Sequence, residues 1–266
     1  MPLIAHISDL HFSYTTEPLR DALRRALRQV NPGLVVISGD LTQRAREAQF
    51  AQAQKFIESL QRPLLVIPGN HDVPLYDLFQ RFFHKSQRFR QYICADLMPV
   101  YQDQPLYVVG VDSTRAFTFD PYGFWKNGAL SDGQLHLLEQ KFQLAPASAL
   151  KVLVMHHPLV NPWNRGQRDT VRGRMRIIRT LEQIGVQVVL SGHLHIAYRD
   201  HAPIFAAEDH KILCIQAGTA ISTRLRDEAN AFNLLDWDGA KLTVTVMRYN
   251  GADFVPDSSD DYVLRS

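Results

Sequence analysis

The first two thirds of the chain alternate short apolar runs with amphipathic stretches. Each apolar run is rich in β-branched residues, has the length of a strand and ends at Gly, Ser, Pro, Asp or His. These runs predict strands over residues 3–7, 34–37, 64–67, 106–111, 152–155 and 186–190. Apolar positions at helical spacing predict helices over residues 19–30, 44–60, 132–142 and 171–184. The alternation favours βαβ units around a largely buried sheet.

The last third has a different pattern. Residues 211–216, 231–237 and 241–249 are strand-like, and Asp238-Gly239 predicts a hairpin turn between the last two. Helical signals are scarce there, so strands within about residues 201–250 are expected to complete a second, more antiparallel sheet. The polar run 256–261 predicts a mobile tail. We therefore expect a single domain over residues 1–266.

Composition and charge narrow the class of partner. The chain has 266 residues, of which 45% are hydrophobic, so it can bury a sizeable core. A formal net charge of +2 disfavours a nucleic-acid polymer and leaves a small phosphorylated molecule compatible. Cys94 and Cys214 suggest no disulfide framework, and no signal peptide or membrane-spanning run is apparent. We expect a reduced, cytoplasmic protein that does not enter a membrane.

Five of the predicted strands are followed by side chains that bind metals. The motifs are Asp9-x-His11, Gly39-Asp40, Gly69-Asn70-His71-Asp72, His156-His157 and Gly192-His193-x-His195. In open α/β sheets, ligands bind where the carboxyl ends of several strands converge. Each motif alone is commonplace in surfaces and cores, but five in succession point to one site. Oxygen and imidazole ligands without thiolate favour Mn, Fe, Zn, Co or Ni.

This order of motifs resembles the full signature of the calcineurin-like metallophosphoesterases, over roughly residues 3–200. It is nearest to the bacterial class III cyclic-nucleotide phosphodiesterase and glycerophosphodiesterase branch. The resemblance implies a four-layer α/β/β/α sandwich of two mixed sheets, two divalent or trivalent transition metal ions, and a homodimer. By position, the implied ligands are Asp9, His11 and His195 for the first metal, Asn70, His156 and His193 for the second, and Asp40 as the bridge.

A binuclear centre predicts a mechanism. Two cations can lower the pKa of a bridging water and clamp a phosphoryl group. We expect the bridging hydroxide to hydrolyse a small phosphodiester, with a 3′,5′-cyclic nucleotide as one candidate. His71 is not needed as a ligand and is the predicted catalytic residue, which protonates the leaving oxygen or stabilises the phosphoryl charge. Asp72 is expected to orient one of these groups.

Other functions remain open on the sequence alone. They are a phosphomonoesterase such as a protein phosphatase or nucleotidase, a nuclease or nucleotide-lipid pyrophosphatase, and a metal-free interaction scaffold. Candidate substrate contacts are Trp125, His157, Arg165 and Arg168. Trp125 belongs to the aromatic segment 116–128, which fits either the mouth of the site or a packed structural loop.

Overall fold

The computed structural model describes residues 3–117, 126–161, 169–202, 212–225 and 228–264. Strands in these ranges form two sheets of six strands each. The first sheet contains β1 Leu3–Ile7, β2 Leu34–Ile37, β3 Leu64–Val66, β10 Ala231–Trp237, β11 Lys241–Tyr249 and β12 Phe254–Val263, in the order β12-β11-β10-β1-β2-β3. The second contains β4 Val100–Asp103, β5 Leu106–Val111, β6 Leu150–Met155, β7 Val188–Ser191, β8 Tyr198–His201 and β9 Leu213–Gln216, in the order β4-β5-β6-β7-β9-β8.

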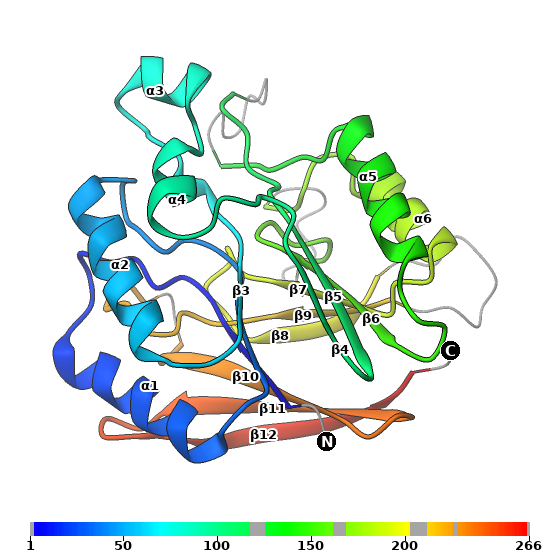
Figure 1. Ribbon diagram of the computed structural model, residues 1–266. Helices are drawn as coiled ribbons and strands as arrows, with labels where there is room; N and C mark the ends of the chain where they lie inside the picture. The colour runs from blue at the N-terminus through cyan, green and yellow to red at the C-terminus, as the bar shows by residue number, and fades with distance from the viewer. Residues whose placement is uncertain (1–2, 118–125, 162–168, 203–211, 226–227, 265–266) are drawn as a thin grey trace.

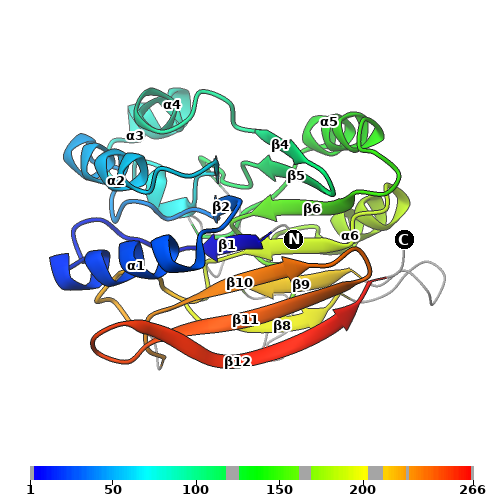
Figure 2. The same cartoon turned by 60° about the horizontal axis from the view of Figure 1, so that its bottom comes forward.

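Helices lie outside the two sheets. They are α1 Glu17–Val30, α2 Glu47–Ser59, α3 Leu78–Phe83, α4 Gln87–Tyr92, α5 Asp132–Gln143 and α6 Arg174–Gln183, with a 3₁₀ turn, η1, at Asn70–Asp72. Figure 1 shows α1 and α2 on one side of the sandwich and α5 and α6 on the other, and Figure 2 shows the strands of both sheets from a second direction. The expected four-layer α/β/β/α sandwich is confirmed.

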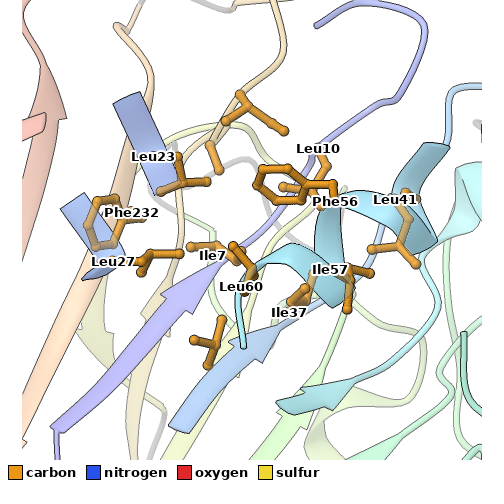
Figure 3. Packing of buried hydrophobic residues seen from close by; sticks show 14 of the residues in the cluster. Ile7, Leu10, Leu23, Leu27, Ile37, Leu41, Phe56, Ile57, Leu60 and Phe232 are labelled. Atoms are coloured by element: carbon orange, nitrogen blue, oxygen red, sulfur yellow. The ribbon is translucent and has the colours of Figure 1, made fainter. Parts of the chain in front are cut away.

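Three apolar layers hold the sandwich together. Between the sheets lie side chains such as Val36 and Val154, both fully buried. On the outer face of the first sheet, Leu23 of α1 and Phe56 of α2 pack with Ile7 of β1, as Figure 3 shows. A third layer joins α5 and α6 to the second sheet. The central strands are apolar on both faces because both faces are covered.

Strand direction brings the polar loops to one place. In the first sheet β1, β2 and β3 run parallel, and in the second β5, β6, β7 and β9 run parallel. Parallel strands present their carboxyl ends at the same edge of a sheet. The loops after β1, β2, β3, β6 and β7 carry the five motifs.

The sequence predicted that the C-terminal strands complete a second sheet, but the structure divides them between the two sheets. β10 pairs antiparallel with β1, so β10, β11 and β12 extend the first sheet. β8 and β9 instead join the second sheet beside β7. Strand pairing across such sequence separations is set by tertiary packing, which local periodicity does not record.

The predicted mobile tail at residues 256–261 is wrong, because this run belongs to β12. β12 is paired antiparallel with β11 along the edge of the first sheet. Its polar side chains pair across the strands: Lys241 and Thr243 both bond Asp261, and Arg248 bonds Asp257. A solvent-facing edge strand can be polar throughout, so its composition resembles a tail.

Besides β12, the sequence did not predict the short elements α3, α4, β4 and β8. α3 projects from the body at the top of Figure 1. Among the described residues, no helix has the combined length and apolarity needed to cross a bilayer.

Candidate metal centre

The first group of candidate ligands contains Asp9, His11 and His195. One ligand atom of each lies within 4.8 Å of the others, and all three residues are buried. The Nε2 atoms of His11 and His195 lie 3.6 and 3.7 Å from the same oxygen, Oδ1 of Asp9. The other oxygen of Asp9 accepts a hydrogen bond from the backbone N–H of His193 at 3.1 Å. One carboxylate oxygen is thus held by the protein while the other faces two imidazoles.

A second group lies beside the first. Nε2 of His156 is 3.1 Å from Oδ1 of Asn70, and Nδ1 of His193 is 2.8 Å from the same amide oxygen. Asp40 stands between the groups. Its Oδ1 is 3.4 Å from Nε2 of His156, and its Oδ2 is 3.8 Å from Nε2 of His11. The structure therefore brings together all seven sequence-predicted ligands, with Asp40 in the position expected of a shared one.

The backbone at these residues is strained. Asp9, His11, Asp40, His193 and His195 all have positive φ, between 45° and 76°. A left-handed conformation costs a non-glycine residue roughly 1–3 kcal/mol, and residues in this conformation cluster at functional sites. It turns each loop sharply at the end of its strand, so that successive polar side chains face a common centre.

Two glycines of the motifs allow the loops to approach one another. A Cβ added at Gly69 would collide with the carboxylate and backbone of Asp40. A Cβ added at Gly192 would collide with the hydroxyl of Ser8 and come within 2.7 Å of the Asp9 carboxylate. The glycines of Gly-Asn-His-Asp and Gly-His-x-His thus provide the space in which neighbouring loops meet.

Burial and carboxylates shift the pKa values of the buried histidines in opposite directions. Burial disfavours the protonated form of His156, but the carboxylates of Asp40 and Asp9 outweigh burial and raise its pKa to about 9. Burial, reinforced by the charge of His156, lowers the pKa of His193 to about 3. The pKa of Asp9 is lowered, because His195 and His11 outweigh the effect of its burial. The carboxylates of the centre therefore favour a positive charge on His156, whereas burial keeps the imidazole of His193 neutral.

His71 lies at the edge of the centre. Its Nδ1 donates to the backbone carbonyl of Gln43 at 2.8 Å, and its backbone N–H donates to Oδ1 of Asp40 at 2.8 Å. One ligand atom of His71 lies within 4.8 Å of those of His11 and Asp40. Burial lowers the pKa of His71, and the carboxylate of Asp40 opposes this shift. The imidazole is held at one nitrogen and directed into the site.

Asp72 ties two of the loops together. Its carboxylate accepts hydrogen bonds from the backbone N–H groups of Gly69, Leu41 and Thr42, at 2.9, 3.1 and 2.8 Å, and from the Thr42 hydroxyl at 3.0 Å. It thereby fixes the loop after β2 against the loop after β3. Burial and the nearby Asp40 raise the pKa of Asp72 to about 6.

His157 supports the centre from within. Its ring centroid lies 5.0 Å from that of His156 and 4.9 Å from that of His193. Its Nδ1 is 2.8 Å from the Ser113 hydroxyl, and its Nε2 donates to the carbonyl of Lys126 at 2.8 Å. Both ring nitrogens are engaged inside the protein, which favours support of its two neighbours over the predicted substrate contact.

Three predicted substrate contacts cannot be placed. Trp125, Arg165 and Arg168 lie outside the described residues. Of the aromatic residues of segment 116–128, Phe117 is described, with its ring centroid 6.4 Å from that of Phe82 in α3.

Sequence reasoning missed Thr219. Its hydroxyl oxygen lies 2.8 Å from Nδ1 of His195, whose Nε2 faces Asp9. This contact fixes the orientation of the imidazole, as hydrogen bonds to metal-binding histidines commonly do. Thr219 follows β9 as the other motifs follow their strands, so its place after an apolar run was the available signal.

The residues of the centre fit metal ions. Oδ1 of Asp9 and Nε2 of His11 are buried, face each other, and have no hydrogen-bond partner among the described residues. Buried polar atoms left without partners are costly, and a cation between them would satisfy both. The donor set of carboxylate, imidazole and amide oxygen is that of a transition-metal site.

A cavity of about 760 Å³ lies elsewhere in the molecule. Its lining includes Lys151, Glu182 and Trp237, and none of the seven predicted ligands. The centre is therefore defined by convergent side chains, and this cavity has no part in it.

Comparison with known proteins identifies the family. The model of the calcineurin-like phosphoesterase family matches residues 2–197. The chain belongs to the calcineurin-like metallophosphoesterases. It carries buried His and Asp groups suited to metal ions, as this family of metal-dependent phosphoester hydrolases requires.

Two relatives and one solved structure are similar to this chain. A probable cyclic nucleotide phosphodiesterase from Synechococcus sp. is 28% identical over 208 residues, covering 73% of this chain and 74% of the relative. The glycerophosphodiester phosphodiesterase GpdQ of Enterobacter lignolyticus is 27% identical over 211 residues, covering 73% and 70%. A dimetal phosphatase from Danio rerio superposes with a TM-score of 0.69 at 12% identity, covering 99% of each chain, and shows the shared fold.

Proposed function

We propose that this chain is a binuclear-metal phosphodiesterase that hydrolyses a small phosphodiester, with 3′,5′-cyclic nucleotides as the first substrates to test. The observation that carries the proposal is the pair of ligand groups joined by Asp40. The names of the relatives, a cyclic nucleotide phosphodiesterase and a glycerophosphodiester phosphodiesterase, support a diester over a monoester.

The proposed ligands follow from the distances. Asp9, His11 and His195 would hold one metal ion. Asn70, His156 and His193 would hold the other, with Asp40 in contact with both. When bound, such a pair of ions activates water and neutralises charge on a phosphoryl group.

The chain's own residues supply the remaining chemistry. The carbonyl of Gln43 keeps a proton on Nδ1 of His71, so Nε2 is the atom left to face substrate. A protonated His71 can therefore donate from Nε2 to the leaving ester oxygen. Thr219 orients His195, and Asp72 holds the loop that positions Asp40 and His71.

The first experiment compares Mn²⁺-loaded protein on bis(p-nitrophenyl) phosphate and p-nitrophenyl phosphate, with metal content measured by mass spectrometry. We expect a preference for the diester. His71→Ala should keep both metals and lose roughly 10²–10⁴-fold in rate, more for poor leaving groups than for p-nitrophenolate. Asp40→Asn should lose metal as well as activity. The exposed His84→Ala should match the wild type.

The outcomes separate the competing functions. Preference for the monoester would replace the proposal with a phosphatase. A wild-type protein that binds no metal and cleaves neither ester would overturn the enzymatic proposal altogether. If His71→Ala lost its metals, His71 would be a ligand and its assigned role would be wrong.

A further inference from the structure

The loop between β9 and β10 belongs to the metal centre. Its described residues are 217–225 and 228–230, and the first of these two segments is bound to the loops that carry the ligands. The N–H of Ala217 donates to the carbonyl of Ser191 at 2.9 Å, and that of Ala220 donates to the carbonyl of Ser8 at 3.0 Å. Ser8 immediately precedes Asp9, and Ser191 lies two residues before His193. The loop is therefore attached to both sides of the first ligand group.

Hydrogen bonds also fix residues 222–224 of this loop. The N–H of Thr223 donates to the carbonyl of Tyr14 at 2.6 Å. The carbonyl of the buried Ser222 accepts from the side-chain amide of Asn230 at 2.8 Å. The hydroxyl of Ser222 accepts from the N–H of Arg224 at 3.1 Å. These bonds hold the backbone of Arg224 beside the loop of Asp9 and His11.

The side chain of Arg224 differs from those of Arg24, Arg25 and Arg199. It is exposed, and within the described ranges it makes no hydrogen bond or ion pair with another side chain. By contrast, Arg24, Arg25 and Arg199 each lie against a carboxylate. Burial and nearby carboxylates dominate the pKa values of His11 and His71, and the positive charge of Arg224 weakly opposes their protonation.

An exposed guanidinium on a loop that is bound to a phosphoesterase centre can bind a phosphate group. Its planar array of N–H donors matches two oxygens of a phosphate and forms charge-assisted hydrogen bonds. The backbone places Arg224 near the first ligand group, because the preceding residue, Thr223, donates to the carbonyl of Tyr14, whose N–H donates to the carbonyl of His11 at 2.9 Å.

We propose that Arg224 binds an anionic oxygen of the substrate phosphoryl group, and that residues 217–225, which are hydrogen-bonded to the ligand loops, are a substrate-binding element of the centre. The inference rests on the proposed phosphoesterase function. It assigns a phosphate contact within the described residues, where the sequence had pointed to Arg165 and Arg168. The same contact should retain the phosphomonoester product, for which inorganic phosphate is a minimal probe.

The test uses Mn²⁺-loaded wild type, Arg224→Ala and Arg224→Lys, with Arg28→Ala as the control. Arg28 is an exposed arginine in the last turn of α1, so its removal makes the same change in net charge away from the centre. Binding of inorganic phosphate is measured by calorimetry, KM and kcat on bis(p-nitrophenyl) phosphate by absorbance, and metal content by mass spectrometry.

We expect Arg224→Ala to keep its metals and its melting temperature, to weaken phosphate binding roughly 10–100-fold and to raise KM more than it lowers kcat. Arg224→Lys should recover part of the affinity, and Arg28→Ala should match the wild type. Wild-type phosphate affinity and KM in Arg224→Ala would overturn the inference while the phosphodiesterase proposal stood. Weakened phosphate binding in a protein that cleaves neither ester would support the inference and overturn the proposed function.

Discussion

At the residue scale, histidines in similar burial acquire opposite properties. His6 and His156 are both fully buried, in β1 and after β6. The pKa of His156 rises to about 9, because two carboxylates outweigh burial. His6 lies 2.9 Å from the Ser38 hydroxyl and has no such pair of carboxylates, so burial lowers its pKa to about 3. His156 is therefore suited to a cationic centre, whereas His6 acts as a neutral core residue.

His6 should make the stability of the protein depend on pH. In the unfolded chain, His6 binds a proton below its ordinary pKa of about 6.5. In the folded chain, His6 stays neutral until the pH falls to about 3. Folding stability is therefore lost as the pH falls through this window, with a slope of about 1.4 kcal/mol per pH unit from this group. Urea unfolding of metal-free wild type and His6→Gln between pH 6.5 and 4 measures it. We expect a slope shallower by about that amount in the variant, and parallel curves would contradict the assignment.

At the scale of elements, the buried cation Arg81 attaches α3 to the neighbouring backbone. Arg81 is buried and donates to the carbonyls of Pro74 and Ala116 at 2.8 and 2.6 Å. Burial lowers its pKa to about 10. The apolar residues of the helix point outward: Leu78, Phe79, Phe82 and Phe83 are exposed. This inverted polarity is the reason that hydrophobic periodicity did not identify α3.

Replacement of Arg81 should detach α3 from the segment around Ala116. Arg81→Met would leave buried carbonyls without donors, at a cost of roughly 1–3 kcal/mol for each group that water does not reach. We expect a loss of about 2–4 kcal/mol in the free energy of unfolding and faster amide exchange over residues 74–83. Arg90→Met, an exposed arginine in α4, is the matched control. Equal stability of the two variants would show that the tether is weak.

At the scale of the whole molecule, the metal centre joins the two sheets. Asp9, Asp40 and Asn70 follow strands of the first sheet, whereas His156 and His193 follow strands of the second. Metal ions bound by all of them would therefore cross-link the two halves of the sandwich.

Metal binding should accordingly stabilise the fold. A ligand that binds only the folded state adds about 2.7 kcal/mol at 100 times its dissociation constant. Titration of chelator-treated protein with Mn²⁺ should raise the melting temperature, and chelator should lower it again. Asp40→Asn should abolish most of the increase. An unchanged melting temperature in the wild type at saturating Mn²⁺ would contradict a metal centre shared by the two sheets.

The sequence was most informative at the strand ends, where a succession of Asp, Asn and His side chains has few explanations. Five strand ends with Asp, Asn and His predicted the family, and the structure brings all seven predicted ligands together. Helices such as α1 and α5 were predicted because amphipathic periodicity and caps are local signals. For example, the hydroxyl of Ser131 caps α5 by accepting from the N–H of Gln134. The single domain over residues 1–266 and the catalytic role of His71 stay predictions.

The sequence by itself determined the alternation of elements, the buried strands and the chemistry at their carboxyl ends, because these depend on neighbouring residues along the chain. Tertiary structure alone decided that β10 pairs with β1 and that a polar run forms β12. It also decided that Thr219 lies beside His195, and that the loop of Thr219 and Arg224 is bound to the loop of Asp9, about 200 residues away. Those contacts depend on which surfaces meet when the two sheets pack. The free energy of that packing is shared among many distant side chains and leaves no local pattern.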